Sequence, residues 1–244
     1  MRCCDSSCCL TPATTAGTLA DDPKYKACIA NAAGCTELNL YSHGLTGPIP
    51  NSIGQLTALT TLELWNNTLT GPIPNSIGQL TALTYQMRLD DNTLTGPIPD
   101  TIGQLTALTY MNVGGNQLTG PIPDTIGQLT ALTQMSWYDN QLTGPIPNSI
   151  GQLTALTNLE LGRNQLTGAG PGICGIVGNK WRSCHLSPNP DWTNGAQCPA
   201  CLNTGPCEPP VTCTGPNSPT PSPTPSPTPS PTPSPTPSPT PSPT

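Results

Sequence analysis

Hydrophobic and polar residues alternate over short stretches that return at fixed intervals along the chain. In one copy, Leu62 and Leu64 alternate with Glu63 and Trp65, a pattern that predicts a half-buried strand. Asn67 follows the strand, where its side chain can satisfy turn backbone groups that would otherwise be buried without partners. Glycine and two prolines then turn the chain, and aliphatic residues bring it back along the opposite side. Each copy therefore predicts one coil with a single exposed strand.

The copies repeat with a period of 24 residues, with one spacing of 25. The motif LTGPIP, followed by IGQLTALT, begins five times, and a sixth LTG follows: Leu45, Leu69, Leu94, Leu118, Leu142 and Leu166. The extra residue lies near Tyr85–Met87 and predicts a bulge in the strand or in the loop before it. One coil cannot bury its own apolar edge, so the stability should come from stacking of neighbouring coils.

The asparagine position is occupied in every copy and predicts a ladder of side chains inside the coils. The members are Asn67, Asn92, Asn116, Asn140 and Asn164, with His43 as a structural substitute in the first copy. Trp137 stands where other copies carry Leu or Val, so it should point inward and locally swell its coil.

The motifs LTGPIP, xxIGQLxxL and LxLxxNxL resemble the plant-type leucine-rich repeat over about Glu37 to Gly168. The resemblance implies an α/β-type, strand-rich repeat solenoid, with a second short strand at LTGPIP and a twisted right-handed superhelix. Upstream, Asp22-Pro23 with Cys28 and Cys35 resembles the N-terminal cap of that family and implies a disulfide between these two cysteines. We expect four regions: a Cys-rich N-terminal cap (1–36), the repeats (37–168), a Cys-rich C-terminal cap or hinge (169–217) and a proline-rich tail (218–244).

The 12 cysteines lie in the two flanks, six up to Cys35 and six from Cys174 onward. Solenoids need capped ends, and disulfides hold small flanks that lack a core. Six cysteines allow 15 pairings in each flank, and the spacing does not choose among them. A zinc site at Cys198, Cys201, Cys207 and Cys213 with His185 is the weaker alternative, because these spacings do not form paired knuckles. We therefore predict no metal and no cofactor.

The tail alternates Ser or Thr with Pro from Ser218 to Thr244. Proline fixes its own φ and pushes the preceding residue into extended geometry, so the tail should form a polyproline II rod. This tail after a Cys-rich hinge resembles the leucine-rich-repeat extensins and other hydroxyproline-rich wall glycoproteins of plants and algae. The resemblance implies hydroxylated or O-glycosylated residues at Ser218, Pro219, Thr220, Pro221, Ser222, Pro223, Thr224, Pro225, Pro227, Pro229, Pro231, Pro233, Pro235, Pro237, Pro239, Pro241 and Pro243.

Composition excludes several functional classes. Only 8% of the residues are charged, and the net charge of −6 with 7 Lys and Arg gives no footprint for nucleic acid. No apolar run is long enough to span a membrane, and the cysteine usage favours a secreted, extracellular protein. No nucleophile elbow, Walker loop or metalloprotease motif is present, so we do not expect an enzyme. Glu63, Asp90 and Asp91 are better explained as a solvated strand face than as paired carboxylates or a Ca²⁺ site.

The copies differ from one another mainly at outward strand positions, which should line the concave surface. These candidate ligand-binding residues are Tyr41, Glu63, Trp65, Arg88, Asp90, Asp91, Tyr110, Asn112, Tyr138, Asp139, Glu160 and Arg163. Exposed aromatic rings with mixed charges suit a ligand or sugar surface, but drift at positions that packing does not fix explains the variation equally well. Asn66, in the single N-glycosylation sequon, should lie on the same face.

Two functional hypotheses follow. The leading one is a non-enzymatic extracellular structural glycoprotein, a subunit of a wall, surface coat or filament that self-assembles or packs with other surface glycoproteins and carries covalent glycans on its rod. The alternative is a recognition module that binds a peptide, a polysaccharide or a secreted enzyme on the concave face. It would resemble polygalacturonase inhibitors or the peptide-binding leucine-rich-repeat extensins.

Overall fold

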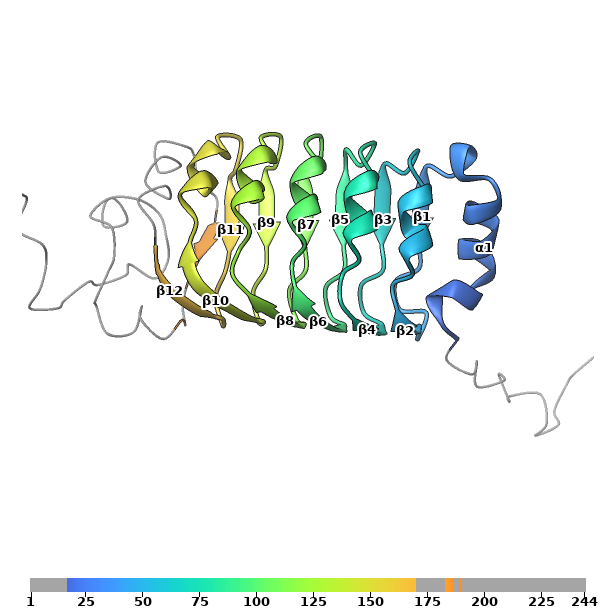
Figure 1. The fold of residues 1–244 in the computed structure, drawn as a ribbon, viewed down its shortest axis with the longest axis horizontal. Helices are drawn as coiled ribbons and strands as arrows, with labels where there is room; N and C mark the ends of the chain where they lie inside the picture. The colour runs from blue at the N-terminus through green and yellow to red at the C-terminus, as the bar shows by residue number, and fades with distance from the viewer. Residues whose placement is uncertain (1–16, 170–182, 187–188, 190–244) are drawn as a thin grey trace, which may run out of the picture.

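The computed structural model describes residues 17–169, 183–186 and 189, which form one row of stacked coils. Each of the first five coils contributes a strand to each of two parallel sheets, followed by a short 3₁₀ helix; the sixth contributes β11 and β12, and β13 extends the first sheet. In Figure 1 the coils stand side by side and helix α1 (Pro23–Ala30) closes the N-terminal end of the row. The predicted strand-rich repeat solenoid is confirmed.

The first sheet has seven parallel strands that follow one another along the row in chain order. The strands are β1 (Glu37–Asn39), β3 (Thr61–Glu63), β5 (Gln86–Arg88), β7 (Tyr110–Asn112), β9 (Gln134–Ser136), β11 (Asn158–Glu160) and β13 (Ser183–His185). The extra residue of the 25-residue copy lies in the loop before β5, because Thr61 still pairs with Gln86 and Glu63 with Arg88. It places Tyr85 outside the sheet, where 64% of the residue is exposed.

The second sheet has six parallel strands, formed by the segments that begin with LTG, as the resemblance to plant-type leucine-rich repeats implied. They are β2 (Thr46–Pro48), β4 (Thr68–Gly71), β6 (Thr93–Pro97), β8 (Gln117–Gly120), β10 (Gln141–Ile146) and β12 (Gln165–Ala169). The glycine of each of the first five motifs has a positive φ, for example +72° at Gly71, which lets the chain turn into the following proline.

The returning side of the coils is built from 3₁₀ helices that lie against one another. These are η3 (Asn51–Gln55), η4 (Asn75–Gln79), η5 (Asp100–Gln104), η6 (Asp124–Gln128) and η7 (Asn148–Gln152), while η1 (Leu19–Asp21) and η2 (Ala32–Gly34) belong to the cap. A Cβ at Gly78 would stand only 2.4 Å from the carbonyl oxygen of Thr101 in the next coil. The repeated glycine is therefore required by the close approach of two backbones.

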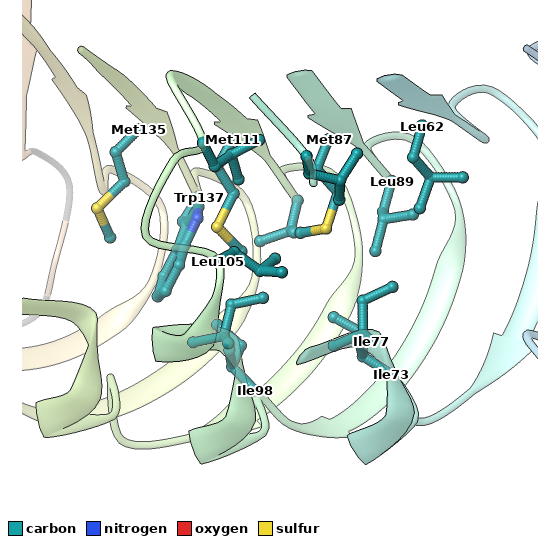
Figure 2. Packing of buried hydrophobic residues seen from close by; sticks show 14 of the residues in the cluster. Leu62, Ile73, Ile77, Met87, Leu89, Ile98, Leu105, Met111, Met135 and Trp137 are labelled. Carbon is teal, nitrogen blue, oxygen red and sulfur yellow. The ribbon is translucent and has the colours of Figure 1, made fainter. Parts of the chain in front are cut away.

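The core runs the length of the row and consists mainly of Leu and Ile that are fully buried. Figure 2 shows Met87, Met111 and Met135 in three successive coils. They occupy the position that Leu62 holds in the coil before Met87. Trp137 points inward as predicted and is fully buried. The predicted swelling does not interrupt the sheet, since Trp137 N still donates to Glu160 O at 2.7 Å. Val113 occupies the equivalent position in the preceding coil and is also fully buried.

The predicted asparagine ladder is present, and each member joins two coils. Asn67 Oδ1 accepts from Leu45 N at 2.9 Å, while Asn67 Nδ2 donates to Leu40 O and Leu64 O, both at 2.9 Å. Two of these three partners belong to the preceding coil, so the side chain replaces the hydrogen bonds that the turn backbone lacks. The same set of contacts recurs at Asn92, Asn116, Asn140 and Asn164.

Two expectations about the ladder and its extent were wrong. His43 is exposed, with its Nδ1 4.0 Å from Asp22 Oδ2, and takes no part in the ladder. The first coil has no preceding repeat whose backbone would need such a bridge. The row of coils also continues beyond residue 168, because β13 pairs with β11 and the buried Asn189 accepts from Leu166 N at 3.0 Å.

The N-terminal cap is fixed by helix capping and by the Cys28–Cys35 disulfide, which is confirmed. Asp22 accepts hydrogen bonds from Lys24 N and Tyr25 N at the start of α1, and Pro23 occupies the first helical turn. Tyr25 is buried and its hydroxyl lies 2.8 Å from Ser52 Oγ in the first 3₁₀ helix of the coils. The four other N-terminal cysteines, the four cysteines of the zinc alternative and the tail lie outside the described residues.

Candidate functional site

The outward side of the seven-stranded sheet, with the turn residues that follow its strands, is called the strand face below. Its positions come from three residues in each coil, because side chains alternate across a strand. In the first coil these are Glu37, Asn39 and Tyr41, and the inward residues between them, Leu38 and Leu40, are fully buried. The predicted candidate residues come from these outward strand positions and from the turns that follow them.

An aromatic and cationic stack occupies the N-terminal half of the strand face. The rings of Tyr41 and Trp65 lie parallel, with centroids 4.7 Å apart and an interplanar angle of 7°. The Arg88 guanidinium lies 4.3 Å from the centroid of Trp65, close enough for a cation–π contact. Arg88 Nε and Nη2 also donate to the Asp90 carboxylate at 3.1 and 2.7 Å. The four side chains hold one another in place before any ligand arrives.

Two of the predicted ligand-binding residues, Asp90 and Asn112, are buried by their neighbours on the strand face. Asp90 is only 2% exposed and Asn112 only 6%, so neither is the open surface group that the sequence suggested. Burial of the Arg88 guanidinium opposes its charge, but the hydrogen bonds and negative charge of Asp90 outweigh this and raise the pKa of Arg88. Asp90 and Asn112 therefore position their neighbours, since Asn112 accepts from Gly114 N at 2.9 Å and donates to Tyr110 Oη at 3.4 Å.

A polar hollow of about 60 Å³ lies in the C-terminal half of the strand face. Its lining comes from β7, β9 and β11: Tyr110, Gln134, Met135, Ser136, Asn158 and Glu160. Ser136 Oγ donates to Glu160 Oε2 at 2.5 Å, and Thr157 Oγ1 donates to Asn158 Oδ1 at 2.9 Å. Burial raises the pKa of Tyr110 above its ordinary value, so this phenol stays protonated at neutral pH. Tyr110 and Glu160 of this hollow were predicted from the sequence, whereas Gln134 and Asn158 were not.

The turns after the strands form a second row of side chains with left-handed backbone. Asn66, Asp91, Asp139 and Arg163 have φ between 53° and 54°. Asn66 is exposed and its Nδ2 donates to Ser42 Oγ at 2.8 Å, and Arg163 lies 3.8 Å from Asp139. Burial, together with the charge of Asp90, raises the pKa of Asp91. The sequon asparagine thus borders the strand face, as predicted.

Two tyrosines complete the surface. A Cβ at Gly114 would stand 2.5 Å from Tyr138 Cε1, so the Tyr138 ring occupies the space that this glycine leaves open. Tyr85 was missed by the sequence analysis, although the 25-residue spacing marks its position. It directly precedes β5 and is strongly exposed, and its carbonyl oxygen accepts from the N–H of Tyr110, the first residue of β7, at 3.1 Å.

The remaining carboxylates do not assemble a metal centre among the described residues, where no group of three or more His, Cys, Asp and Glu side chains is placed to hold an ion. Glu63 instead accepts a hydrogen bond from Gln86 Nε2. Within the same residues, no helix has the length and apolar character needed to cross a bilayer. The strand face can therefore bind by stacking, hydrogen bonding and charge.

Comparison with known proteins agrees with this architecture. The family model for the leucine-rich repeat matches residues 58–80 and 107–129. The ectodomain of the receptor kinase SOBIR1 from Arabidopsis thaliana is 30% identical, with a TM-score of 0.51, and the match covers 55% of this chain and 73% of that one. This chain belongs to the leucine-rich-repeat proteins. No curated protein sequence matches this leucine-rich-repeat chain.

Two longer plant receptors match the leucine-rich-repeat chain over more of its length. The GASSHO1/SCHENGEN3 ectodomain from Arabidopsis thaliana, solved with CASPARIAN STRIP INTEGRITY FACTOR 2, is 33% identical with a TM-score of 0.64. The Arabidopsis receptor kinase HAESA, solved with the peptide hormone IDA and the co-receptor SERK1, is 30% identical with a TM-score of 0.63. Each match covers 71% of this chain but only 20% and 28% of the receptor chains, so this chain spans less than a third of the length of either receptor chain.

Proposed function

We propose that this protein is a non-enzymatic recognition module whose strand face binds an extended extracellular ligand. The observation that supports this proposal is that only one side of the coil varies from copy to copy. The buried positions and the LTGPIP strands are nearly the same in every copy, whereas the side chains of the strand face change from coil to coil. Identical coils need no such variation for packing, so a bound partner is the better explanation than drift.

The geometry of the face supports the same function. Trp65 is fixed between Tyr41 and Arg88, and Arg88 is fixed in turn by Asp90. Side chains that are already ordered lose less conformational entropy when a ligand binds. HAESA, which was solved with a peptide hormone, supports a peptide as one class of ligand. The similarity to the GASSHO1/SCHENGEN3 ectodomain supports an extracellular location.

The test is direct binding of the full chain to a panel of synthetic secreted-type peptides and soluble wall oligosaccharides, measured by biolayer interferometry. At least one ligand should bind saturably, and Trp65→Ala should weaken that binding about 10-fold or more, since buried aromatic anchors commonly contribute over 1.4 kcal/mol. The control is Gln141→Ala, an exposed residue of β10 in the second sheet. Equal losses in both variants, or a ligand whose hydrogen-exchange protection maps to the second sheet, would remove the proposal.

A structural role remains a second candidate because of the Ser-Pro-Thr-Pro sequence of residues 218–244. In that role the coils would serve as a docking block and the tail as a glycan-covered rod in a wall, coat or filament. Mass spectrometry of native material should then find hydroxyproline or O-glycans on the tail, and electron microscopy should show fibres or lattices. Unmodified tails on dispersed monomers would argue against it.

A further inference from the structure

The polar hollow between β7, β9 and β11 is lined almost entirely by groups that form hydrogen bonds. A phenol, two carboxamides, a hydroxyl and a carboxylate converge on it, and its one apolar residue, Met135, is fully buried beneath. A volume of about 60 Å³ is the size of a hydroxyl or hydroxymethyl group rather than of a large apolar side chain. The hollow therefore lacks the apolar lining on which most anchoring side chains of peptides depend.

The hydrogen-bonding capacity of the lining matches hydroxyl groups. Asn158 Oδ1 already accepts from Thr157, which directs its amide N–H groups toward other acceptors. Gln134 is exposed and offers both a donor and an acceptor. Each hydroxyl of a sugar is also a donor and an acceptor, so adjacent carboxamides can bind a pair of neighbouring hydroxyls. The half-buried Tyr110 ring, with its hydroxyl held by Asn112, gives a flat apolar surface beside them.

The net charge of the strand face favours neutral over anionic saccharides. The candidate residues of the strand face include five carboxylates (Glu63, Asp90, Asp91, Asp139, Glu160) and two guanidinium groups (Arg88, Arg163). Both guanidinium groups face carboxylates, at 2.7 Å for Arg88 and Asp90 and 3.8 Å for Arg163 and Asp139. The surface is therefore net negative and would repel a polyuronate. The Glu160 carboxylate already accepts from Ser136, so its charge is partly satisfied without a cationic ligand.

We propose that this hollow is a subsite for a neutral saccharide, with a hydroxyl or hydroxymethyl group seated among Gln134, Asn158 and Glu160 and a pyranose ring lying against Tyr110. The proposal rests on the recognition function proposed above and names the ligand class of its C-terminal half. Tyr85, directly before the neighbouring strand β5, provides a further exposed ring.

The experiment titrates the full chain with cellohexaose, mannohexaose and xyloglucan heptasaccharide, with hexagalacturonate as the anionic comparison, by saturation-transfer NMR and calorimetry. At least one neutral oligosaccharide should bind with micromolar to millimolar affinity, and hexagalacturonate should bind at least about 10-fold more weakly. Gln134→Ala and Tyr110→Ala should each weaken the neutral ligand about 5-fold or more, which corresponds to one lost hydrogen bond or stacking contact. Gln141→Ala, the same residue type in the same coil but in the second sheet, should leave binding unchanged.

Three outcomes would overturn the subsite. They are no binding by any neutral oligosaccharide, binding of hexagalacturonate as tight as the neutral ligands, or neutral binding that Gln134→Ala does not weaken. If a peptide of the panel still binds and Trp65→Ala still weakens it, the recognition function stands and only the saccharide assignment fails. If no ligand of either class protects the strand face, both proposals fail.

Discussion

The asparagine ladder gives the sharpest test of how the coils are held together. Asn140 accepts from Leu118 N at 3.0 Å and donates to Val113 O at 3.0 Å, and it also reaches two carbonyls of its own coil, at 3.2 and 3.4 Å. In Asn140→Ala, the three carbonyl oxygens keep other donors, from Asn116, Asn164 and Gly115. The Leu118 N–H, by contrast, loses its Asn140 acceptor inside the protein.

The lost hydrogen bonds set the expected decrease in the free energy of unfolding of Asn140→Ala. A buried N–H without a partner costs about 1–3 kcal/mol, and the lost net contribution of the remaining hydrogen bonds adds about 1 kcal/mol. The free energy of unfolding should therefore fall by about 2–4 kcal/mol, a large share of the 5–15 kcal/mol typical of a domain. His43→Ala, at the equivalent position of the first coil, should change it by less than about 0.5 kcal/mol because His43 is exposed.

Urea unfolding followed by circular dichroism, with hydrogen exchange to locate the weakened coils, measures both variants. The amides of the coils that hold Val113 and Leu118 should exchange faster in Asn140→Ala, while α1 stays protected. A loss below about 1 kcal/mol for Asn140→Ala, or an equal loss for His43→Ala, would refute the view that the ladder replaces missing backbone hydrogen bonds.

Other predictions address the 3₁₀ side, the cap and the strand face. Gly78→Ala should lower the free energy of unfolding by about 1–3 kcal/mol in urea titrations, because its Cβ would clash with the Thr101 backbone. Cys28→Ser should destabilise the cap by about 2–3 kcal/mol, the value for so short a loop, with faster hydrogen exchange in α1 than in the coils. Burial raises the pKa of Tyr110 above 10.0, so the unfolded chain loses this proton first and stability falls as the pH rises through 10.0; Tyr110→Phe should flatten that part of a stability–pH curve.

The repeat made most of the fold predictable from the sequence. Periodic residues such as Leu62 and Asn67 have the same neighbours in every coil, so local pattern and tertiary environment agree. The errors arose where that periodicity ends. His43 has no preceding coil to bridge, and the sequence that follows β13 and Asn189 lacks the LTGPIP motif. Its only sequence signal is the spacing of Cys184, Leu186 and Asn189, which matches the strand and ladder positions of the other copies.

The candidate site was less predictable because its properties come from contacts between coils. Nothing in the sequence near Asp90 shows that it is buried, since this follows from Arg88 folding over Trp65 of the preceding coil. The hollow likewise joins three strands that are 24 residues apart. Gln134 and Asn158 occupy the same strand position as Tyr110, and alignment of the copies at that position would have identified them.

The same geometry explains why this fold can vary one surface without losing stability. Inward neighbours such as Leu38, Leu62 and Met135 fix the backbone of each strand, so an outward side chain contributes little to the core. Replacements on the strand face should therefore change binding more than unfolding, except at Asp90 and Asn112, whose buried hydrogen bonds serve both. Such exceptions mark where the strand face is rigid, because the groups that hold the Arg88 and Tyr110 side chains in place are themselves part of the packed structure.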